Sequence, residues 1–97
     1  MPRATPEWLT AEYDNRARVA GWQEHLQRWA QASELARAKL SRRLDVAFGP
    51  APTDRLDIFP SPRANAPVLV FIHGGYWRAL DKRDGSYVAP AFVDAGA

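Results

Sequence analysis

Cysteine is absent from the 97-residue sequence, and histidine occurs only 2 times. The lack of cysteine excludes disulfide frameworks, thiol nucleophiles and cysteine-based zinc or iron–sulfur sites. The histidines have no cluster of carboxylates around them, so we expect no metal and no cofactor. The longest apolar run, Val68 to Ile72, falls far short of the roughly 20 residues that cross a membrane. The first residues do not form a signal peptide, and we therefore expect a cytoplasmic protein without a membrane partner.

A large excess of charge of either sign is also missing. The chain has 13 Lys and Arg against 11 Asp and Glu, for a net charge of +2. Proteins that bind nucleic acid usually gather basic residues on one face with few acids between them. Here Glu7, Asp14 and Glu24 lie among the basic residues of the first half. Nucleic acid is therefore not the expected partner, and an arginine-rich binder stays an alternative whose affinity should fall steeply with salt.

Two helices are expected in the first 43 residues. Thr5-Pro6-Glu7 has the pattern of an N-cap, a proline at the first helical position and an acid in the first turn. This pattern predicts a short helix from Pro6 to about Tyr13. We expect Trp8 and Leu9 to dock this helix on the rest of the protein.

A longer helix is expected near Gly21 to Arg43, as a cover that lies on other elements. Its apolar stripe includes His25, which we interpret as a hydrogen-bonded packing residue rather than a ligand or a base. At about 100° per residue, the positions that share the buried face are Trp22, His25, Leu26, Trp29, Ser33, Ala36 and Leu40.

The second half of the chain changes to strand patterns. Leu44 to Phe48 and Leu56 to Ile58 alternate apolar and polar residues around a Gly-Pro turn, which predicts a hairpin. Val68 to Ile72 is apolar at every position. Such a run is typical of a strand that is covered on both faces in a parallel sheet.

The motif His73-Gly74-Gly75-Tyr76-Trp77 follows this apolar run directly. At the carboxyl end of a parallel strand, backbone N–H groups in a tight Gly-Gly turn can point into the crevice where ligands bind. The motif resembles the loop after the third strand of α/β-hydrolases, and its Tyr-Trp variant resembles the kynurenine formamidase (arylformamidase) branch and its esterase relatives. The resemblance covers nearly the whole chain, in order through Trp8-Leu9, Tyr13-Asp14-Asn15-Arg16, Leu44 to Gly49 and Leu56 to Phe59.

The resemblance implies a role for each residue of this motif. Gly75 and Tyr76 would supply the backbone N–H groups of an oxyanion hole, and Gly74 would make the turn. His73 lies before any nucleophile elbow, so it matches a loop-shaping residue whose ring bonds nearby backbone, not the catalytic base. Tyr76 or Trp77 would stack on an aromatic substrate in the pocket, although Trp77 fits equally well as a lid residue that packs on the last helix.

No serine of the sequence has the Gly-x-Ser-x-Gly surroundings of a nucleophile elbow. Ser86 comes nearest, but it begins an expected helix from about Ser86 to Ala95, with Asp84 or Ser86 at its N-terminal cap and Gly96 at its end. No catalytic residue is therefore assigned. The nucleophile, acid and base are expected beyond Ala97, and the chain alone is expected to be inactive.

Together these features predict an α/β fold, namely the N-terminal part of one α/β-hydrolase domain over residues 1–97. Residues 1–43 would form a helical cover segment, and residues 44–97 would hold the first three strands, the oxyanion loop and the first core helix. The expected function is acyl transfer to water from a small aryl formamide or carboxylic ester. The alternative is a non-catalytic fragment that acts as a protein-binding or scaffold module through the helix from Trp22 to Leu40. A homo-oligomer or a complementing chain would supply neighbours for the unpaired strand.

Overall fold

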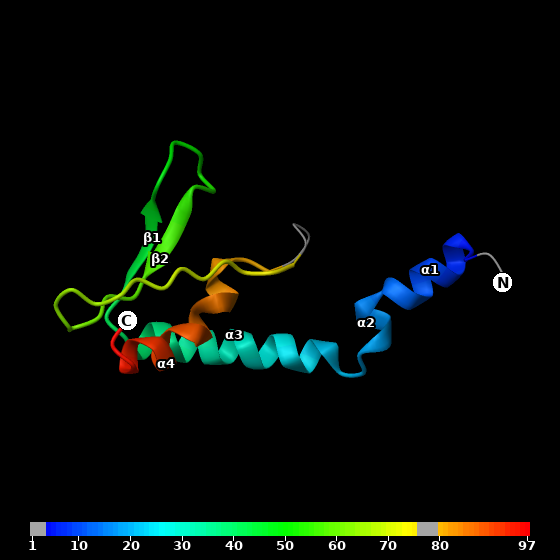
Figure 1. Cartoon of the computed structure of the whole chain (residues 1–97), viewed down its shortest axis with the longest axis horizontal. Coiled ribbons are helices and arrows are strands. Elements are labelled where there is room, and N and C mark those ends of the chain that lie inside the picture. Colours follow the sequence, from blue (N-terminus) through cyan, green and yellow to red (C-terminus); the bar gives the residue numbers. More distant parts are fainter. Residues whose placement is uncertain (1–3, 76–79) are drawn as a thin grey trace.

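The computed structural model describes residues 4–75 and 80–97. They form helices α1 (Pro6–Tyr13), α2 (Asn15–Arg18), α3 (Trp22–Lys39) and α4 (Ala89–Asp94), the 3-10 helix η1 (Lys82–Val88), and strands β1 (Arg43–Ala47) and β2 (Arg55–Ile58). The molecule is elongated, with extents of 60 × 31 × 22 Å, and α3 runs along it with the hairpin at one end and α1 at the other (Figure 1). None of the described helices combines the length and the apolar character needed to cross a membrane.

α1 and α2 lie at the end of α3 that is far from the hairpin (Figure 1). As predicted, α1 begins after Thr5, whose side-chain oxygen accepts a hydrogen bond from the N–H of Trp8 at 3.1 Å. The prediction that Trp8 and Leu9 dock this helix is wrong, because no residue of α1 is buried and Trp8 is 53% exposed. The main contacts of α1 are with α2, which has 4 residues and is too short to cover an apolar face.

α3 packs on η1 with one stretch of its predicted apolar face. Ser33 and Ala36 are buried there. Trp29 stacks on Tyr87 of η1, with the ring centroids 5.9 Å apart and the planes at 10°. η1 therefore covers this stretch of the apolar face of α3, so that less of the face is exposed for an external protein partner.

Two details of α3 differ from the sequence prediction. The helix ends at Lys39 rather than near Arg43, because Leu40 is already extended (φ −90°, ψ 150°) and leads into β1. His25 is exposed rather than packed, and its Nδ1 lies 2.7 Å from an Arg28 guanidinium nitrogen. The reason is that η1 covers α3 around its buried C-terminal half and does not cover the turn that carries His25.

Ser33 links α3 to η1 through a buried hydroxyl. Its side chain is 0% exposed, and its oxygen accepts the N–H of Tyr87 at 2.9 Å. Replacing Ser33 with alanine leaves that N–H without an acceptor, and we expect the free energy of unfolding to fall by about 1–3 kcal/mol. Urea unfolding followed by circular dichroism measures the change. Ser41→Ala, at an exposed serine, is the matched control, and equal losses in both variants would contradict the role of Ser33.

The last helical region consists of two elements instead of the single helix predicted from about Ser86 to Ala95. η1 begins earlier, at Lys82, because Asp81 and Asp84 form a capping box in which each carboxylate accepts a backbone N–H across the first turn. Ser86 is therefore not a cap, and it lies buried within η1.

The end of α4 follows the prediction. Gly96 has a φ of 101°, a left-handed conformation that glycine adopts without steric cost. Its N–H donates to the carbonyl of Val93 at 3.0 Å, and the N–H of Ala97 donates to the carbonyl of Phe92 at 2.9 Å. This pair of bonds is the Schellman pattern that closes a helix.

β1 and β2 form the antiparallel hairpin that the alternating pattern predicted. Its turn is closed by Asp54, whose carbonyl accepts the N–H of Phe48 and whose carboxylate accepts the N–H of Ala51, each at 3.0 Å. The pairing is irregular around Asp45, which has a positive φ of 57°. This irregularity interrupts the regular alternation of side chains along β1.

The apolar run from Val68 to Ile72 forms no strand in this structure. The prediction of a covered strand in a parallel sheet is wrong here, because the sheet of the described residues contains only β1 and β2. Val68 is 87% exposed and Ile72 is 83% exposed. A parallel strand needs neighbours that exchange hydrogen bonds with it, and no described segment pairs with this run. The described fold is thus a mixture of helices and a two-stranded antiparallel sheet.

Candidate functional site

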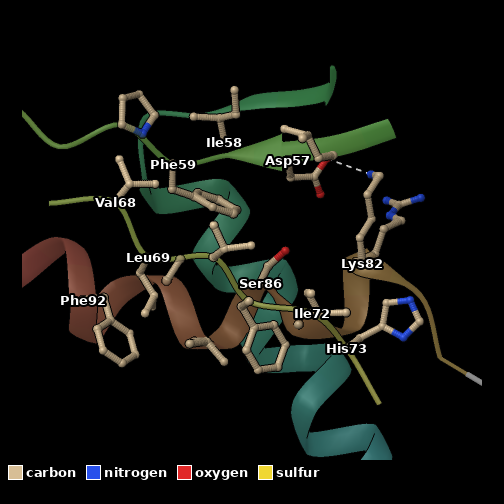
Figure 2. A pocket seen from close by; sticks show the side chains of 18 of the residues that line it. Asp57, Ile58, Phe59, Val68, Leu69, Ile72, His73, Lys82, Ser86 and Phe92 are labelled. Carbon is tan, nitrogen blue, oxygen red and sulfur yellow. Dashed lines mark hydrogen bonds and ion pairs between the residues drawn. The ribbon is translucent and has the colours of Figure 1, made fainter. Parts of the chain in front are cut away.

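The run from Val68 to Ile72 crosses an open hollow of about 1210 Å³. In Figure 2, β2 lies along one side of this hollow, η1 and α4 lie along the other, and the run passes between them. Much of the lining is apolar, including Phe59 beside the hairpin and Phe92 from α4. Polar side chains, among them Lys82 and His73, gather at one end (Figure 2). A ligand with an apolar body and a polar group would fit these surroundings.

The predicted oxyanion loop begins at that polar end. His73 is exposed, and its Nδ1 lies 2.7 Å from the carbonyl oxygen of Gly74, which accepts a hydrogen bond from it. Gly75 has a φ of 119°, a conformation that residues with a side chain rarely adopt. The backbone therefore requires glycine at the first of the two expected oxyanion donors. The second donor, Tyr76, and the predicted pocket residue Trp77 lie outside the described residues.

Ser86 also lines the hollow, but its surroundings do not suit a nucleophile. The residue is 4% exposed, and its hydroxyl accepts a hydrogen bond from the Arg37 guanidinium at 3.0 Å. The same guanidinium donates to the carbonyl of Arg83 at 2.5 Å. A guanidinium has no acceptor atom and cannot take the serine proton, so Arg37 serves as a structural partner of η1.

An ionic cluster of three residues, which no sequence prediction named, lies between the start of η1 and the hairpin. The ammonium of Lys82 lies 2.6 Å from a carboxylate oxygen of Asp45 and 2.7 Å from one of Asp57. Figure 2 shows Lys82 reaching from η1 to Asp57 on β2. The Asp57 side chain is only 6% exposed, and the same oxygen also accepts the N–H of Asp45 at 2.9 Å. In residues 4–75 and 80–97, no group of three or more His, Asp or Glu side chains could hold a metal ion.

One sequence signal could have found this cluster. Each strand of the hairpin carries an aspartate between two apolar residues, in Leu44-Asp45-Val46 and in Leu56-Asp57-Ile58. An acid at a half-buried strand position needs a partner of opposite charge. The partner comes from Lys82, far along the chain, so the pattern shows the need but not the identity of the cation.

The cluster shifts the pKa of two of its members. The hydrogen bond from Lys82, followed by the charge of Lys82, holds the pKa of the Asp45 carboxyl below its ordinary value. Burial lowers the pKa of Lys82, but the hydrogen bonds and charges of Asp45 and Asp57 outweigh it, so the net pKa of Lys82 is raised. Both shifts favour the charged forms of Asp45 and Lys82.

The two shifts predict how stability depends on pH. The contribution of Asp45 to the free energy of unfolding is present above the ordinary carboxyl pKa of about 4. It is lost as pH falls through the lowered pKa that Asp45 has in the folded state. The contribution of Lys82 is present below about pH 10 and is lost as pH rises through its raised value. As pH falls from about 5 to about 2, the range in which carboxylates take up protons, we expect the urea concentration at the unfolding midpoint to decrease. The decrease should be smaller in Lys82→Met. The same acid dependence in Lys82→Met and in the exposed control Lys39→Met would contradict this account.

Comparison with known proteins finds two related sequences, and both are named kynurenine formamidase. The chain is 31% identical over 75 residues to the kynurenine formamidase of Danio rerio, a match that covers 75% of this chain and 26% of that protein. It is 27% identical over 74 residues to the kynurenine formamidase of Salmo salar, which covers 74% of this chain and 25% of that protein. No protein-family model and no solved structure matches the chain. The chain spans about a quarter of the length of these curated relatives, and over that quarter its sequence supports an arylformamidase-like relationship.

Proposed function

We propose that this chain is part of a hydrolase that transfers the acyl group of an aryl formamide or carboxylic ester to water. The observation that carries the proposal is the sequence similarity to two kynurenine formamidases over about three quarters of the chain. Two features support it: the His73-Gly74-Gly75 turn at the polar end of an apolar hollow, and the positive φ of Gly75.

The proposed chemistry places the loop at the carbonyl oxygen of the substrate. Attack of a serine hydroxyl on the carbonyl carbon forms a tetrahedral intermediate, and the former carbonyl oxygen becomes negatively charged. The N–H groups of Gly75 and Tyr76 donate hydrogen bonds to this oxygen, where each donor is worth about 3 kcal/mol in the transition state. The amine or alcohol then leaves with a proton, and water releases the acyl group. The nucleophile, base and acid of this reaction are not assigned to residues of this chain.

The proposed α/β-hydrolase fold requires parallel strands beside the run from Val68 to Ile72, and the described residues do not supply them. In such a fold the run from Val68 to Ile72 pairs with further parallel strands. Those strands would cover side chains that are now exposed and would place the loop at the carboxyl edge of a sheet.

A hybrid protein tests the proposed function. In the hybrid, this chain replaces the stretch that it matches in the Danio rerio kynurenine formamidase, and hydrolysis of N-formylkynurenine and p-nitrophenyl acetate is measured. We expect the hybrid to hydrolyse at least one of the two substrates and the 97-residue chain alone to hydrolyse neither. A folded but inert hybrid contradicts the proposal. Activity of the chain alone that is abolished by changing His73 or Ser86 contradicts the roles given to those two residues.

A further inference from the structure

The run from Val68 to Ile72 has the composition of a strand but none of the hydrogen-bonded neighbours. It lies outside every helix and strand, and Figure 1 draws it as a plain trace. Among residues 4–75 and 80–97, no backbone hydrogen bond joins an N–H or C=O group of the run to another residue. Its backbone is therefore available to a partner strand. Pro67, which has no N–H, limits such a ladder to the run itself.

Exposure alternates along the run. The second and fourth residues are half exposed, with values of 50% for Leu69 and 51% for Phe71. The first, third and fifth residues are far more exposed, with values of 87% for Val68, 75% for Val70 and 83% for Ile72. A period of two is that of an extended chain whose side chains point to opposite faces. The run therefore has an inner face and an outer face, and the outer face consists of three β-branched side chains.

The inner face already lies against the molecule. The ring of Phe71 packs on η1 at Gly85, where an added Cβ would lie 2.7 Å from a ring carbon. Leu69 and Phe71 both line the hollow between η1 and the hairpin. Because the inner face is held in this way, the outer face and the backbone edge are the parts that a partner can cover.

A second copy of this chain suits the free edge because the run and its flanks carry no charge. From Ala64 to Gly75 the sequence has no Asp, Glu, Lys or Arg. Two such segments lie side by side without like charges opposite each other and without burying an ionised group. Contiguous exposed apolar surface of this kind is typical of protein–protein contacts.

We propose that the run is a self-association edge, along which the run of a second copy adds as an antiparallel strand. The two-fold axis passes through Val70, which lies opposite the Val70 of the other copy. In this register Val68 lies opposite Ile72, and Leu69 lies opposite Phe71. Opposite residues of an antiparallel pair share a face, so exposed side chains meet exposed ones and packed side chains meet packed ones. A shift by one position would mix the two faces.

The absence of cysteine from the chain allows a direct test of this register. Cα atoms of opposite residues lie about 4.5–5.5 Å apart, within the range that a disulfide spans. We therefore expect oxidised glutathione to cross-link the 97-residue Val70→Cys chain into a dimer, measured by non-reducing gel electrophoresis. Val68→Cys is the matched control, because its thiol is at least as exposed but lies about 14 Å from its own copy. Val70→Cys should give at least about 10-fold more dimer, since paired strands hold its thiols at a raised effective concentration. An equal mixture of Val68→Cys and Ile72→Cys should form a cross-linked heterodimer.

Sedimentation of the chain tests the association without a cross-link. Five-residue strands bury little area, and interfaces below about 1,200 Å² are typical of weak complexes. We expect the unmodified chain to shift from monomer to dimer as its concentration rises. Val70→Lys places two ammonium groups opposite each other at the axis and should remain monomeric. Val19→Lys, the same change at the exposed valine that follows α2, should dimerise as the unmodified chain does.

Several results would overturn the inference. A chain that sediments as a monomer up to about 1 mM, or as assemblies larger than a dimer, contradicts two-fold pairing. Equal cross-linking of Val68→Cys and Val70→Cys contradicts the register, and equal dimerisation of Val70→Lys and Val19→Lys contradicts the edge. If Val70→Lys loses the helical circular dichroism of the unmodified chain, the cross-linking pattern decides, because a thiol keeps the outer face apolar.

The inference concerns the 97-residue chain by itself and does not rest on the proposed function. An active hybrid together with a chain that stays monomeric would reject self-association and leave the proposed function standing. A chain that cross-links through Val70→Cys, together with a folded but inert hybrid, would reject the proposed function and leave self-association standing.

Discussion

Replacing the backbone amide of Gly75 by an ester is expected to lower kcat of the hybrid for N-formylkynurenine by about 10²- to 10³-fold. The exchange, made by incorporating glycolic acid at this position, removes one N–H and leaves the chain without a new side chain. The expected loss is large because the negative charge on the substrate oxygen develops in the transition state, where a pre-oriented donor stabilises it most. KM should change little, since the neutral carbonyl of the bound substrate gains less from the same donor.

The neighbouring glycine supplies the matched control. Gly74 makes the turn in our account and donates nothing to the oxyanion, and the space around its Cα is open. The same ester exchange at Gly74 should leave kcat within a few-fold of the unmodified hybrid. Equal losses at both glycines, or no loss at Gly75, would contradict the assignment of the Gly75 N–H.

Gly85→Ala is expected to lower the free energy of unfolding by about as much as Ser33→Ala. A Cβ at this buried position would lie 2.7 Å and 3.0 Å from two ring carbons of Phe71, which is closer than atoms in contact approach. The ring must move away, and overpacking of this kind costs about 1–3 kcal/mol in the free energy of unfolding. We also expect the run from Val68 to Ile72 to lose its contact with η1.

A double substitution tests whether Phe71 is the cause. Phe71→Leu combined with Gly85→Ala makes room for the new methyl group, so the two changes should be less damaging together than the sum of their separate effects. Gly74→Ala, which meets no atom within 4 Å, should be nearly neutral. Strict additivity of the Phe71 and Gly85 changes in urea unfolding would contradict a direct clash.

The parts of the fold that sequence patterns predicted are those decided by nearby residues. Thr5 caps α1, Gly96 closes α4, and the alternating residues around Asp54 form the hairpin. In each case the partners lie within a few positions or across one turn. Patterns of this kind carry their own hydrogen-bond partners and therefore do not depend on the rest of the molecule.

The parts that sequence patterns missed depend on remote partners. The run from Val68 to Ile72 has the composition of a buried strand, but a strand forms only where another strand offers its edge. Trp8 is apolar, which predicts docking, yet no residue of α1 is buried against the described part of the chain. Lys82 finds Asp57 across 25 positions, and no local pattern indicates which cation closes that pair.

In the candidate site, too, features that depend on nearby residues were predictable and contacts with remote residues were not. The glycine pair after an apolar run predicts a tight turn, and Gly75 has the positive φ that such a turn gives to glycine. The role of this turn as an oxyanion loop stays a prediction. The aspartates of the hairpin strands indicate that a cation is needed, but only the structure identifies that cation as Lys82, at the start of η1. The roles of Tyr76 and Trp77 stay predictions from the resemblance.

The amide proton of Gly75 offers the most direct test of whether this loop binds an oxyanion. In the hybrid labelled with ¹⁵N-glycine, a phosphonate inhibitor would form a tetrahedral adduct whose charged oxygen mimics the intermediate. We expect the Gly75 amide proton to move strongly downfield when the adduct forms, while that of Gly96 at the end of α4 stays where it is. A Gly75 resonance that does not respond to an adduct fully formed at the active site would contradict the account.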